Sequence, residues 1–373
     1  MKKYILHTGL DEFRDKNAYL LLKLHESQNI KSIVLSQDVN KNDRVIAEKY
    51  KECRVYIVPG HLKRVIMFIY LVLYFRPVHI ELYYGQSYLH SLCYFLIAKI
   101  CRIPIFSICR GGEVLYWGKR KKVIDAVYWF LMKNSRLLLL KEPYMFAVLK
   151  ERNVVKNNGK VVEVYNKVPF PDMKIPATNR DLLYLNTFKS WRYPELIIES
   201  YPYLGKQLHT DAIPNARIIG LRNNEGCLSE KEKNVIQMAR KSTNKDKFSV
   251  EPFSTDVTRI FMECGIFVLP ADIIFCNYAL LEAMSYGLVP VVTDNDPYLD
   301  RIINNRSNGM VIKPSAEALA EALVELLENT ELFCLLSKNA RKTIYKRFNI
   351  EKYVDEMVQV YRTKLWNGNG TQK

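Results

Sequence analysis

The amino-acid sequence predicts an α/β protein with two domains, each built on a parallel sheet wrapped by helices. Short apolar runs typical of buried strands alternate with helical patterns in both halves of the chain. A proline-containing stretch at residues 168–179 interrupts this alternation, as a linker does. The length of 373 residues fits two domains, at roughly 150 residues each. We expect ligands at the carboxyl ends of the strands, in a central cleft that the two domains face.

The strands expected in the first domain are short and apolar, and a helical pattern follows most of them. These strands are residues 3–8, 31–35, 54–58, 79–84, 105–109, 137–140 and 161–165. The helical patterns are residues 16–26, 63–75, 88–100, 122–133 and 143–152. Because a helix returns the chain to the starting edge after each strand, we expect the strands to be parallel.

The second domain repeats this alternation after the linker. Its strands are expected at residues 182–185, 216–220, 248–250, 266–269 and 289–292, and its helices at 194–207, 229–241, 256–264 and 277–286. Three terminal helices are expected at residues 316–328, 331–347 and 351–364. The predicted boundaries are therefore 1–170, 171–350, and a last segment, 351–373, whose helix packs back towards the first domain and ends in a short tail.

The net positive charge lies almost entirely in the first half of the chain. Residues 1–170 carry 29 Lys and Arg against 14 Asp and Glu, whereas residues 171–373 carry 26 against 25. A basic half suits nucleic acid, an anionic membrane or a phosphorylated substrate. No zinc-finger, RNP-type or basic-zipper pattern accompanies the charge, so nucleic acid is not expected as a partner.

Export and disulfide bonding are not expected. No signal peptide follows Lys2 and Lys3, and the longest apolar stretch, residues 65–75, is too short to span a bilayer. The eight cysteines show no CxxC or metal-ligand spacing and suit reduced core thiols. The sequence therefore indicates a cytoplasmic protein.

Residues 266–292 contain the most informative pattern, which reads as strand, loop, short helix and strand. A helix starting near Asn277 and ending at Gly287 would point its first backbone N–H groups at the preceding loop, where they can bind an anion. Glu282 lies about one turn further, among apolar residues, and can accept two hydrogen bonds from a vicinal diol. A pyrophosphate and a ribose fit this pair of groups. The alternative is that Glu282 is a surface residue of an amphipathic helix.

Several ordered motifs resemble the retaining glycosyltransferase family 4, whose GT-B architecture has two Rossmann-like doubly wound domains. The resemblance is best over residues 182–365. It is carried by LLEAM at 280–284, GLVPVVTD at 287–294, SNGMVIKPSAEALAEAL at 307–323 and RKTIYKRFNIEKYVDEMVQVY at 341–361. It implies that the first domain binds the acceptor and the second binds a UDP- or GDP-sugar donor, which is a substrate; no further cofactor and no metal are expected.

The resemblance also implies a set of donor contacts. Glu282 would hold the ribose hydroxyls, and the backbone N–H groups of Cys276, Asn277, Tyr278 and Ala279 would bind the diphosphate. The residues expected to bind the donor are Asn186, Thr187, Lys189, Arg192, Gly220, Arg222, Phe253, Asp272, Ile274, Phe275, Cys276, Asn277, Tyr278, Ala279 and Glu282. Among them, Arg192 stands at the lysine of the family's basic pair, Thr187 at its arginine and Asn186 at its glycine, and Lys189 is a substitute cation.

One departure from the family concerns the carboxylate that usually approaches the donor sugar, because Ile274 stands in its place. Either Asp272 or Asn277 takes the role, or the sugar is held differently, or the chain is catalytically weak. In the first domain, Arg110 stands where the family has a histidine, and it would stabilise the leaving diphosphate or grip an acceptor phosphate. We expect Arg110, Glu282 and Asn277 to be catalytic.

The acceptor is expected at the carboxyl edge of the first sheet. The residues expected to bind it are Gly9, Arg110, Gly111, Gly112 and Glu113. Asn166, which matches an asparagine turn of the family, would close the first domain. The apolar run at 62–75 and the basic run at 119–122 suggest docking on an anionic membrane face to reach a polyprenyl-diphosphate-linked glycan, as in bacterial polysaccharide assembly; the alternative for the apolar run is an ordinary core helix.

Two other functions remain open from the sequence. A nucleotide-sugar epimerase or hydrolase would share the donor site without an acceptor. A non-catalytic nucleotide- or glycan-binding protein would explain why Ile274 and Thr187 replace the family's charged residues.

Overall fold

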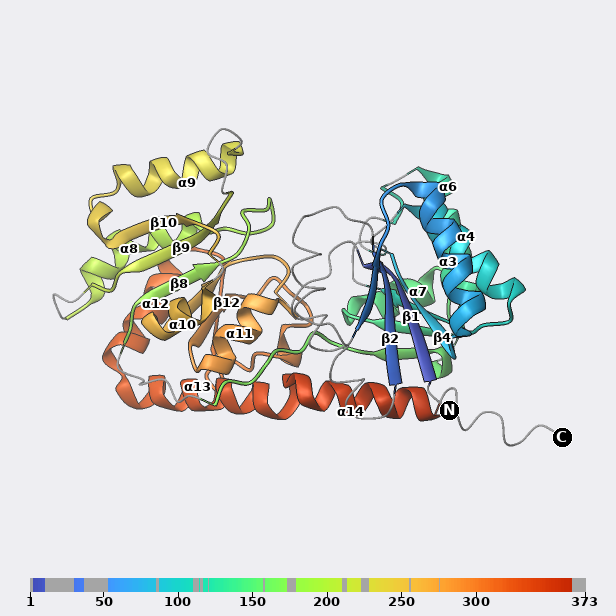
Figure 1. Ribbon diagram of the computed structural model, residues 1–373. Coiled ribbons are helices and arrows are strands. Elements are labelled where there is room, and N and C mark those ends of the chain that lie inside the picture. The colour runs from blue at the N-terminus through green and yellow to red at the C-terminus, as the bar shows by residue number, and fades with distance from the viewer. Residues whose placement is uncertain are drawn as a thin grey trace. The chain divides into compact units, whose positions relative to one another are not determined.

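A computed structural model describes residues 3–10, 30–36, 53–84, 87–109, 114, 117–119, 121–156, 158–172, 179–209, 213–222, 228–254, 256–274 and 276–363. The chain forms two compact units (Figure 1). The first unit comprises Met1–Tyr165 and Ile350–Lys373, and the second comprises Asn166–Asn349.

The first unit contains a seven-stranded sheet. Its strands are β1 (Lys3–Leu10), β2 (Ile30–Ser36), β3 (Arg54–Ile57), β4 (His79–Tyr83), β5 (Ile105–Cys109), β6 (Leu137–Leu140) and β7 (Val161–Glu163). Its helices are α3 (His61–Phe75), α4 (Tyr88–Ile100), α6 (Lys122–Asn134), α7 (Tyr144–Glu151), the 3₁₀ turn Asn158–Lys160 and α14 (Ile350–Tyr361). The strand order is β3-β2-β1-β4-β5-β6-β7, and every neighbouring pair is parallel. The helix predicted at 16–26 lies outside the described residues.

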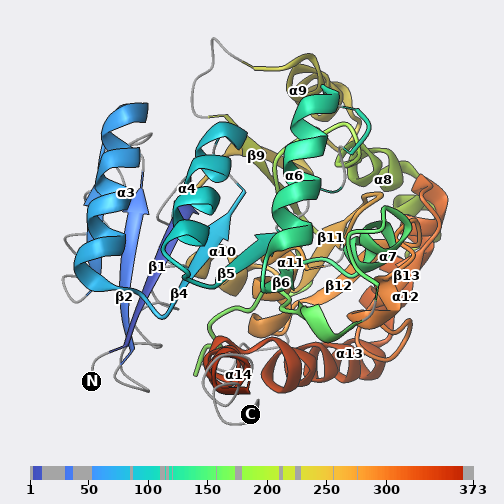
Figure 2. The same cartoon turned by 90° about the vertical axis from the view of Figure 1, so that its right-hand side faces the viewer.

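Both faces of this sheet are buried, which explains why its strands are continuous apolar runs. Alternate residues of a strand point to opposite faces. Leu6 and Leu138 pack into a core with α3, α4, α6 and α7, whereas Ile5 and Leu137 pack into a second core with α14. Figure 2 shows α3, α4 and α6 side by side on one face. The last helix of the chain therefore belongs to the unit in which the chain begins.

A buried carboxylate links α14 to the centre of this sheet. Glu81 Oε2 lies 3.0 Å from His7 Nδ1 and accepts a hydrogen bond of 3.1 Å from the Tyr83 hydroxyl, while Oε1 accepts one from the Tyr361 hydroxyl of α14. His79 Nε2 lies 3.7 Å from Glu81 Oε1. Burial raises the pKa of Glu81, but His7 and His79 together outweigh it and hold this pKa well below its ordinary value. Burial lowers the pKa of His79.

The second unit contains a six-stranded sheet. Its strands are β8 (Leu182–Leu185), β9 (Ala216–Leu221), β10 (Phe248–Pro252), β11 (Ile266–Leu269), β12 (Val289–Thr293) and β13 (Met310–Ile312). Its helices are α8 (Glu195–Gln207), α9 (Glu230–Lys241), α10 (Val257–Glu263), α11 (Tyr278–Tyr286), α12 (Ala316–Glu328), α13 (Thr330–Thr343) and short turns at Lys245–Lys247 and Leu299–Arg301. The order is β10-β9-β8-β11-β12-β13, and all neighbouring pairs are parallel. The carboxyl ends of these strands therefore lie at one edge.

The prediction of two parallel α/β domains is confirmed, and two elements differ from it. Strand β13 was not predicted, because its three residues are too few to show a period. A single helix was predicted over residues 331–347, but α13 ends at Thr343 and Ile344–Phe348 is a π-helix. Thr343 Oγ1 donates to the carbonyl oxygen of Asn339 at 2.9 Å, a side-chain contact that bends helices.

None of the described helices has both the length and the apolarity that crossing a bilayer requires.

Candidate functional site

The amino end of α11 lies at the carboxyl edge of the second sheet, directly after β11. Asn277 caps this helix, since its Oδ1 accepts a hydrogen bond of 3.2 Å from the Leu280 N–H group. This cap does not use the N–H groups of Tyr278 and Ala279, which are the donors that an anion would need. No acidic residue lies in the first turn. The helix ends at Gly287, whose φ of 88° is the left-handed conformation that the sequence predicted there.

Glu282 is the one acidic residue of α11. It is half-buried, whereas Leu280, Leu281 and Met284 are buried. Glu282 follows Tyr278 by four residues and so lies on the same face of the helix, one turn from its amino end. The structure thus places the Glu282 carboxylate one turn inside a helix whose amino end follows β11.

The loop between β11 and α11 is tied to its neighbours by hydrogen bonds from both sides. Asp272 Oδ2 accepts one of 2.7 Å from the Tyr193 hydroxyl, and Oδ1 accepts one of 2.7 Å from the Asn295 amide. Ile274 is fully buried, and its N–H group donates to Asp296 Oδ2 at 2.8 Å. The Ile274 side chain therefore packs in the core and offers no surface to a ligand. Of the two substitutes considered for the missing carboxylate, Asp272 is held by neighbours and Asn277 serves as the helix cap.

Asn166 contributes to this loop, which the sequence did not predict. We predicted that Asn166 closes the first domain, but it belongs to the second unit, where its amide donates a hydrogen bond of 2.8 Å to the carbonyl oxygen of Cys276. Cys276 has a φ of 53°, a conformation that residues other than glycine rarely adopt. Asn166 thus stabilises the strained turn before α11. The separation of 110 residues between the two partners leaves no local signal in the sequence.

The loop after β8 holds the predicted basic residues. The Arg192 guanidinium donates to the carbonyl oxygen of Thr187 at 3.0 Å and to the Thr187 hydroxyl, and burial lowers its pKa. The backbone of Arg192 forms an antiparallel bridge with Ala271, which joins this loop to the end of β11. Asn186 Oδ1 accepts a hydrogen bond of 3.1 Å from the Thr187 N–H group. Lys189 is exposed in the same loop.

The ends of β9 and β10 complete the edge. At Gly220 an added Cβ would lie 1.8 Å from the carbonyl oxygen of Asn186, so only glycine fits there. Arg222 is exposed, and its N–H group donates to Glu232 Oε1 at 3.0 Å. Phe253 is exposed after β10, and its N–H group donates to the carbonyl oxygen of Leu221 at 3.1 Å.

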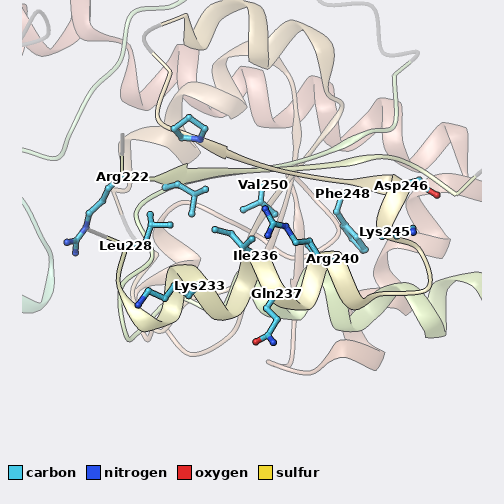
Figure 3. Close-up of a pocket in the computed structure, with 13 residues that line it drawn as sticks. Arg222, Leu228, Lys233, Ile236, Gln237, Arg240, Lys245, Asp246, Phe248 and Val250 are labelled. Atoms are coloured by element: carbon cyan, nitrogen blue, oxygen red, sulfur yellow. The ribbon is translucent and has the colours of Figure 1, made fainter. Parts of the chain in front are cut away.

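A pocket of about 1140 Å³ lies between α9 and the strands β9 and β10 (Figure 3). Arg222 is its only predicted residue. Its cationic side chains are Arg222, Lys233, Arg240 and Lys245, and its apolar lining includes Leu228, Ile236, Phe248 and Val250. The lining residues 233, 236, 237 and 240 recur at the spacing of one helix face. This spacing is the pattern in the sequence from which the pocket wall could have been predicted.

Hydrogen bonds thus link the predicted loops after β8 and β11 to each other and to the end of β12, and the ends of β9 and β10 lie on the same edge.

The predicted Arg110, Gly111, Gly112, Glu113 and Phe275 lie outside the described residues. Gly9 is the last residue but one of β1 in the first unit, where it is buried with a φ of 77°. Within the described ranges, no group of three or more His, Cys, Asp and Glu side chains could hold a metal ion.

The capping role of Asn277 makes a prediction with a matched control. Asn277→Ala and Ser315→Ala each remove a side-chain cap, since Ser315 accepts a hydrogen bond of 3.2 Å from Ala318 at the start of α12. Both are expected to lower the free energy of unfolding by about 1 kcal/mol. Only Asn277→Ala should also weaken UDP binding, because α11 carries the predicted anion site. Urea denaturation and titration calorimetry would measure the two effects. Equal UDP affinity in both variants would contradict the assignment of α11.

Comparison with known proteins finds a described family that matches part of the chain. Residues 169–343 match the family described as Glycosyl transferases group 1. A Haemophilus influenzae protein named as an uncharacterized glycosyltransferase is 25% identical over 128 residues, covering 34% of this chain and 36% of that protein. The Escherichia coli UDP-Gal:alpha-D-GlcNAc-diphosphoundecaprenol alpha-1,3-galactosyltransferase is 31% identical over 107 residues, covering 28% of this chain and 27% of that enzyme. The chain thus spans about a third or less of the length of these relatives.

The fold is similar to solved structures along the whole chain. A glycosyltransferase from Rickettsia africae has a TM-score of 0.78 at 14% identity, covering 98% of this chain and 99% of its own. The Anabaena protein HepE, solved in complex with UDP-glucose, has a TM-score of 0.75 at 13% identity, covering 96% of this chain and 99% of its own. The fold is therefore GT-B, and the match to the group 1 glycosyl transferases covers residues 169–343, just under half of the chain.

Proposed function

We propose that the protein is a glycosyltransferase that moves a sugar from a nucleotide-diphosphate donor to a glycan acceptor. The observation that carries this proposal is the pairing, on one face of α11, of the first-turn amides with Glu282 one turn further. The amino end of a helix carries roughly half a positive charge, which suits a diphosphate. The carboxylate of Glu282 suits the two hydroxyls of a ribose.

The neighbouring loop supplies further positive charge for the leaving diphosphate. Arg192 is held on Thr187 next to the end of β11, and Lys189 is exposed in the same loop. Because negative charge develops on the phosphate as the sugar departs, fixed positive groups lower the barrier without reorganising. We assign Arg192 and Lys189 to this role; the similar role of Arg110 stays a prediction from sequence.

The finer assignments are supported by resemblance. The motifs at 280–294 resemble the retaining glycosyltransferase family 4, so we propose transfer with retention, in which the acceptor hydroxyl attacks on the face that the diphosphate leaves. We propose that neither a metal nor a further cofactor is required. The E. coli relative is named for a diphosphoundecaprenol-linked acceptor, which supports a lipid-linked acceptor and a role in surface polysaccharide assembly at the inner face of the membrane.

A donor panel tests the proposal. UDP-, GDP- and ADP-sugars would be tested for thermal stabilisation and for donor consumption with and without a lipid-linked glycan, in the presence and absence of EDTA. We expect one UDP- or GDP-sugar to stabilise the protein and to be consumed only with acceptor, and EDTA to have no effect. Release of free sugar without acceptor would favour a hydrolase, and stabilisation by no nucleotide would overturn the proposal. The anomeric configuration of the product, read by NMR, tests retention.

A second candidate is a protein that binds nucleotide without turnover. Two observations favour it. Ile274, which stands in place of the family's carboxylate, is buried. Asp272, which could replace that carboxylate, is hydrogen-bonded to Tyr193 and Asn295 instead. In that case UDP would bind, no donor would be consumed with any acceptor, and Glu282→Gln would change affinity alone.

A further inference from the structure

The helices α3 and α4 expose an apolar surface on the first unit. Residues exposed on α3 are Leu62, Ile66, Ile69, Tyr70, Leu73 and Tyr74. On α4 they are Leu89, Leu96 and Ile100. We call these nine residues the outer face. They make up more than half of the exposed large hydrophobic side chains among the described residues. Isolated apolar residues are normal on a surface, whereas a cluster of this size marks an interaction site.

The spacing of the α3 residues shows that they form one regular side of the helix. On α3 the positions 62, 66, 69, 70 and 73 follow the helical period and point away from the sheet. The opposite side of the same helix carries Phe68, Leu71 and Val72, which are buried in the core of the first sheet. The apolar run at 62–75 is therefore a core helix on one side and an exposed apolar surface on the other. In Figure 2 α3 and α4 lie next to each other on one face of the sheet.

The charges on these two helices have one sign. Neither α3 nor α4 contains an acidic residue. Lys63 and Lys99 are exposed on them, and Arg76 and Arg102 are exposed directly after them. Exposed Lys121 and Lys122 add further positive charge at the start of α6. An apolar surface on two helices that carry cations and no acidic residue fits an anionic bilayer, which accepts apolar side chains at its interface and attracts Lys and Arg.

We propose that the outer face of α3 and α4 docks on the anionic surface of a lipid bilayer. A second copy of the chain fits less well, because pairing two such surfaces face to face would bring like charges together. This proposal adds a membrane contact to the proposed function. It rests on the proposed function only for the reason why the protein would dock, which is access to a lipid-linked acceptor. Its test needs no sugar transfer, so the two can fail separately.

Flotation with vesicles tests the docking surface. Wild-type protein would be mixed with phosphatidylcholine vesicles with and without phosphatidylglycerol. The variant Leu62→Gln/Leu73→Gln changes side chains that are 73% and 62% exposed, and Gln suits a helix nearly as well as Leu. We expect about a tenfold or greater loss of binding to anionic vesicles for this pair. For Lys63→Gln/Lys99→Gln we expect about a thirtyfold loss, at roughly fivefold per charge.

A matched control changes two exposed apolar residues of the second unit. Met262→Gln/Leu335→Gln alters side chains that are 40% and 51% exposed on α10 and α13, and it should bind vesicles like wild type. Glu282→Gln should also bind like wild type, and the Leu62→Gln/Leu73→Gln variant should still act on a lipid-free acceptor. The proposal is overturned if wild type does not float with anionic vesicles, if the outer-face variant floats equally well, or if sedimentation shows a dimer that this variant dissociates.

Discussion

Glu282→Gln is expected to lower kcat/KM for sugar transfer by about a hundredfold, or ~2.7 kcal/mol of transition-state stabilisation. A carboxylate accepts two charge-assisted hydrogen bonds from a ribose diol, whereas an amide offers one acceptor and turns a donor towards the second hydroxyl. Steady-state kinetics with the donor found in the panel would measure the loss, and calorimetry with UDP would show how much of it is lost binding.

The control for this experiment is Glu321→Gln, which removes an exposed carboxylate from α12 in the same unit. It should leave both kcat/KM and UDP affinity unchanged. If Glu282→Gln behaved like this control, the carboxylate would be a surface group of an amphipathic helix and the donor site would have to lie elsewhere.

The largest expected effect on stability belongs to Glu81→Ala, which should lower the free energy of unfolding by about 3–5 kcal/mol. The change removes the common partner of His7, Tyr83 and Tyr361 and leaves their polar groups in the core without it. Chemical denaturation would measure the loss. Tyr361→Phe, which removes one hydrogen bond and keeps the ring, should cost about 1–2 kcal/mol. A Glu81→Ala variant as stable as Tyr361→Phe would show that the cluster does not hold α14 to the sheet.

The same cluster predicts how stability depends on pH. The folded pKa of His79 is lowered from its ordinary value of 6.5, so below pH 6.5 the unfolded chain takes up this proton first and stability falls. The folded pKa of Glu81 lies well below its ordinary value of 4.5, so its contribution is complete above pH 4.5 and is lost as the pH falls further. Denaturation from pH 8 to pH 4 would show the decline. Wild-type stability that rose as the pH fell from 6.5 to 4 would contradict these directions.

The architecture was predictable because strands buried on both faces leave an unmistakable pattern. Residues 137–140 and 266–269 are apolar without alternation, and in the structure β6 and β11 are buried in full. The end of α11 at Gly287 was predictable for a local reason, since only glycine adopts its φ of 88° without strain. Strand β13 was missed because three residues carry too little periodic signal.

The sequence predicted the helix of the site but not the hydrogen bonds that support it. The motif at 280–284 placed Glu282 on α11, and Gly287 marked the end of that helix. The hydrogen bonds that Asn166 donates to Cys276 and Ile274 donates to Asp296 join residues 110 and 22 positions apart. No local pattern encodes such a contact, because it depends on which loops the sheet brings to one edge.

The sequence by itself determined the two parallel sheets, the amino end of α11 and the placement of Glu282 one turn inside it, since each follows from local period and from short-range backbone geometry. Only the tertiary structure decided that Ile274 is buried, that Asp272 is held by Tyr193 and Asn295, and that α3 is core on one side and exposed on the other. The physical reason is that burial and hydrogen-bond partners depend on segments far apart in the chain, and a one-dimensional pattern carries no record of which of them meet.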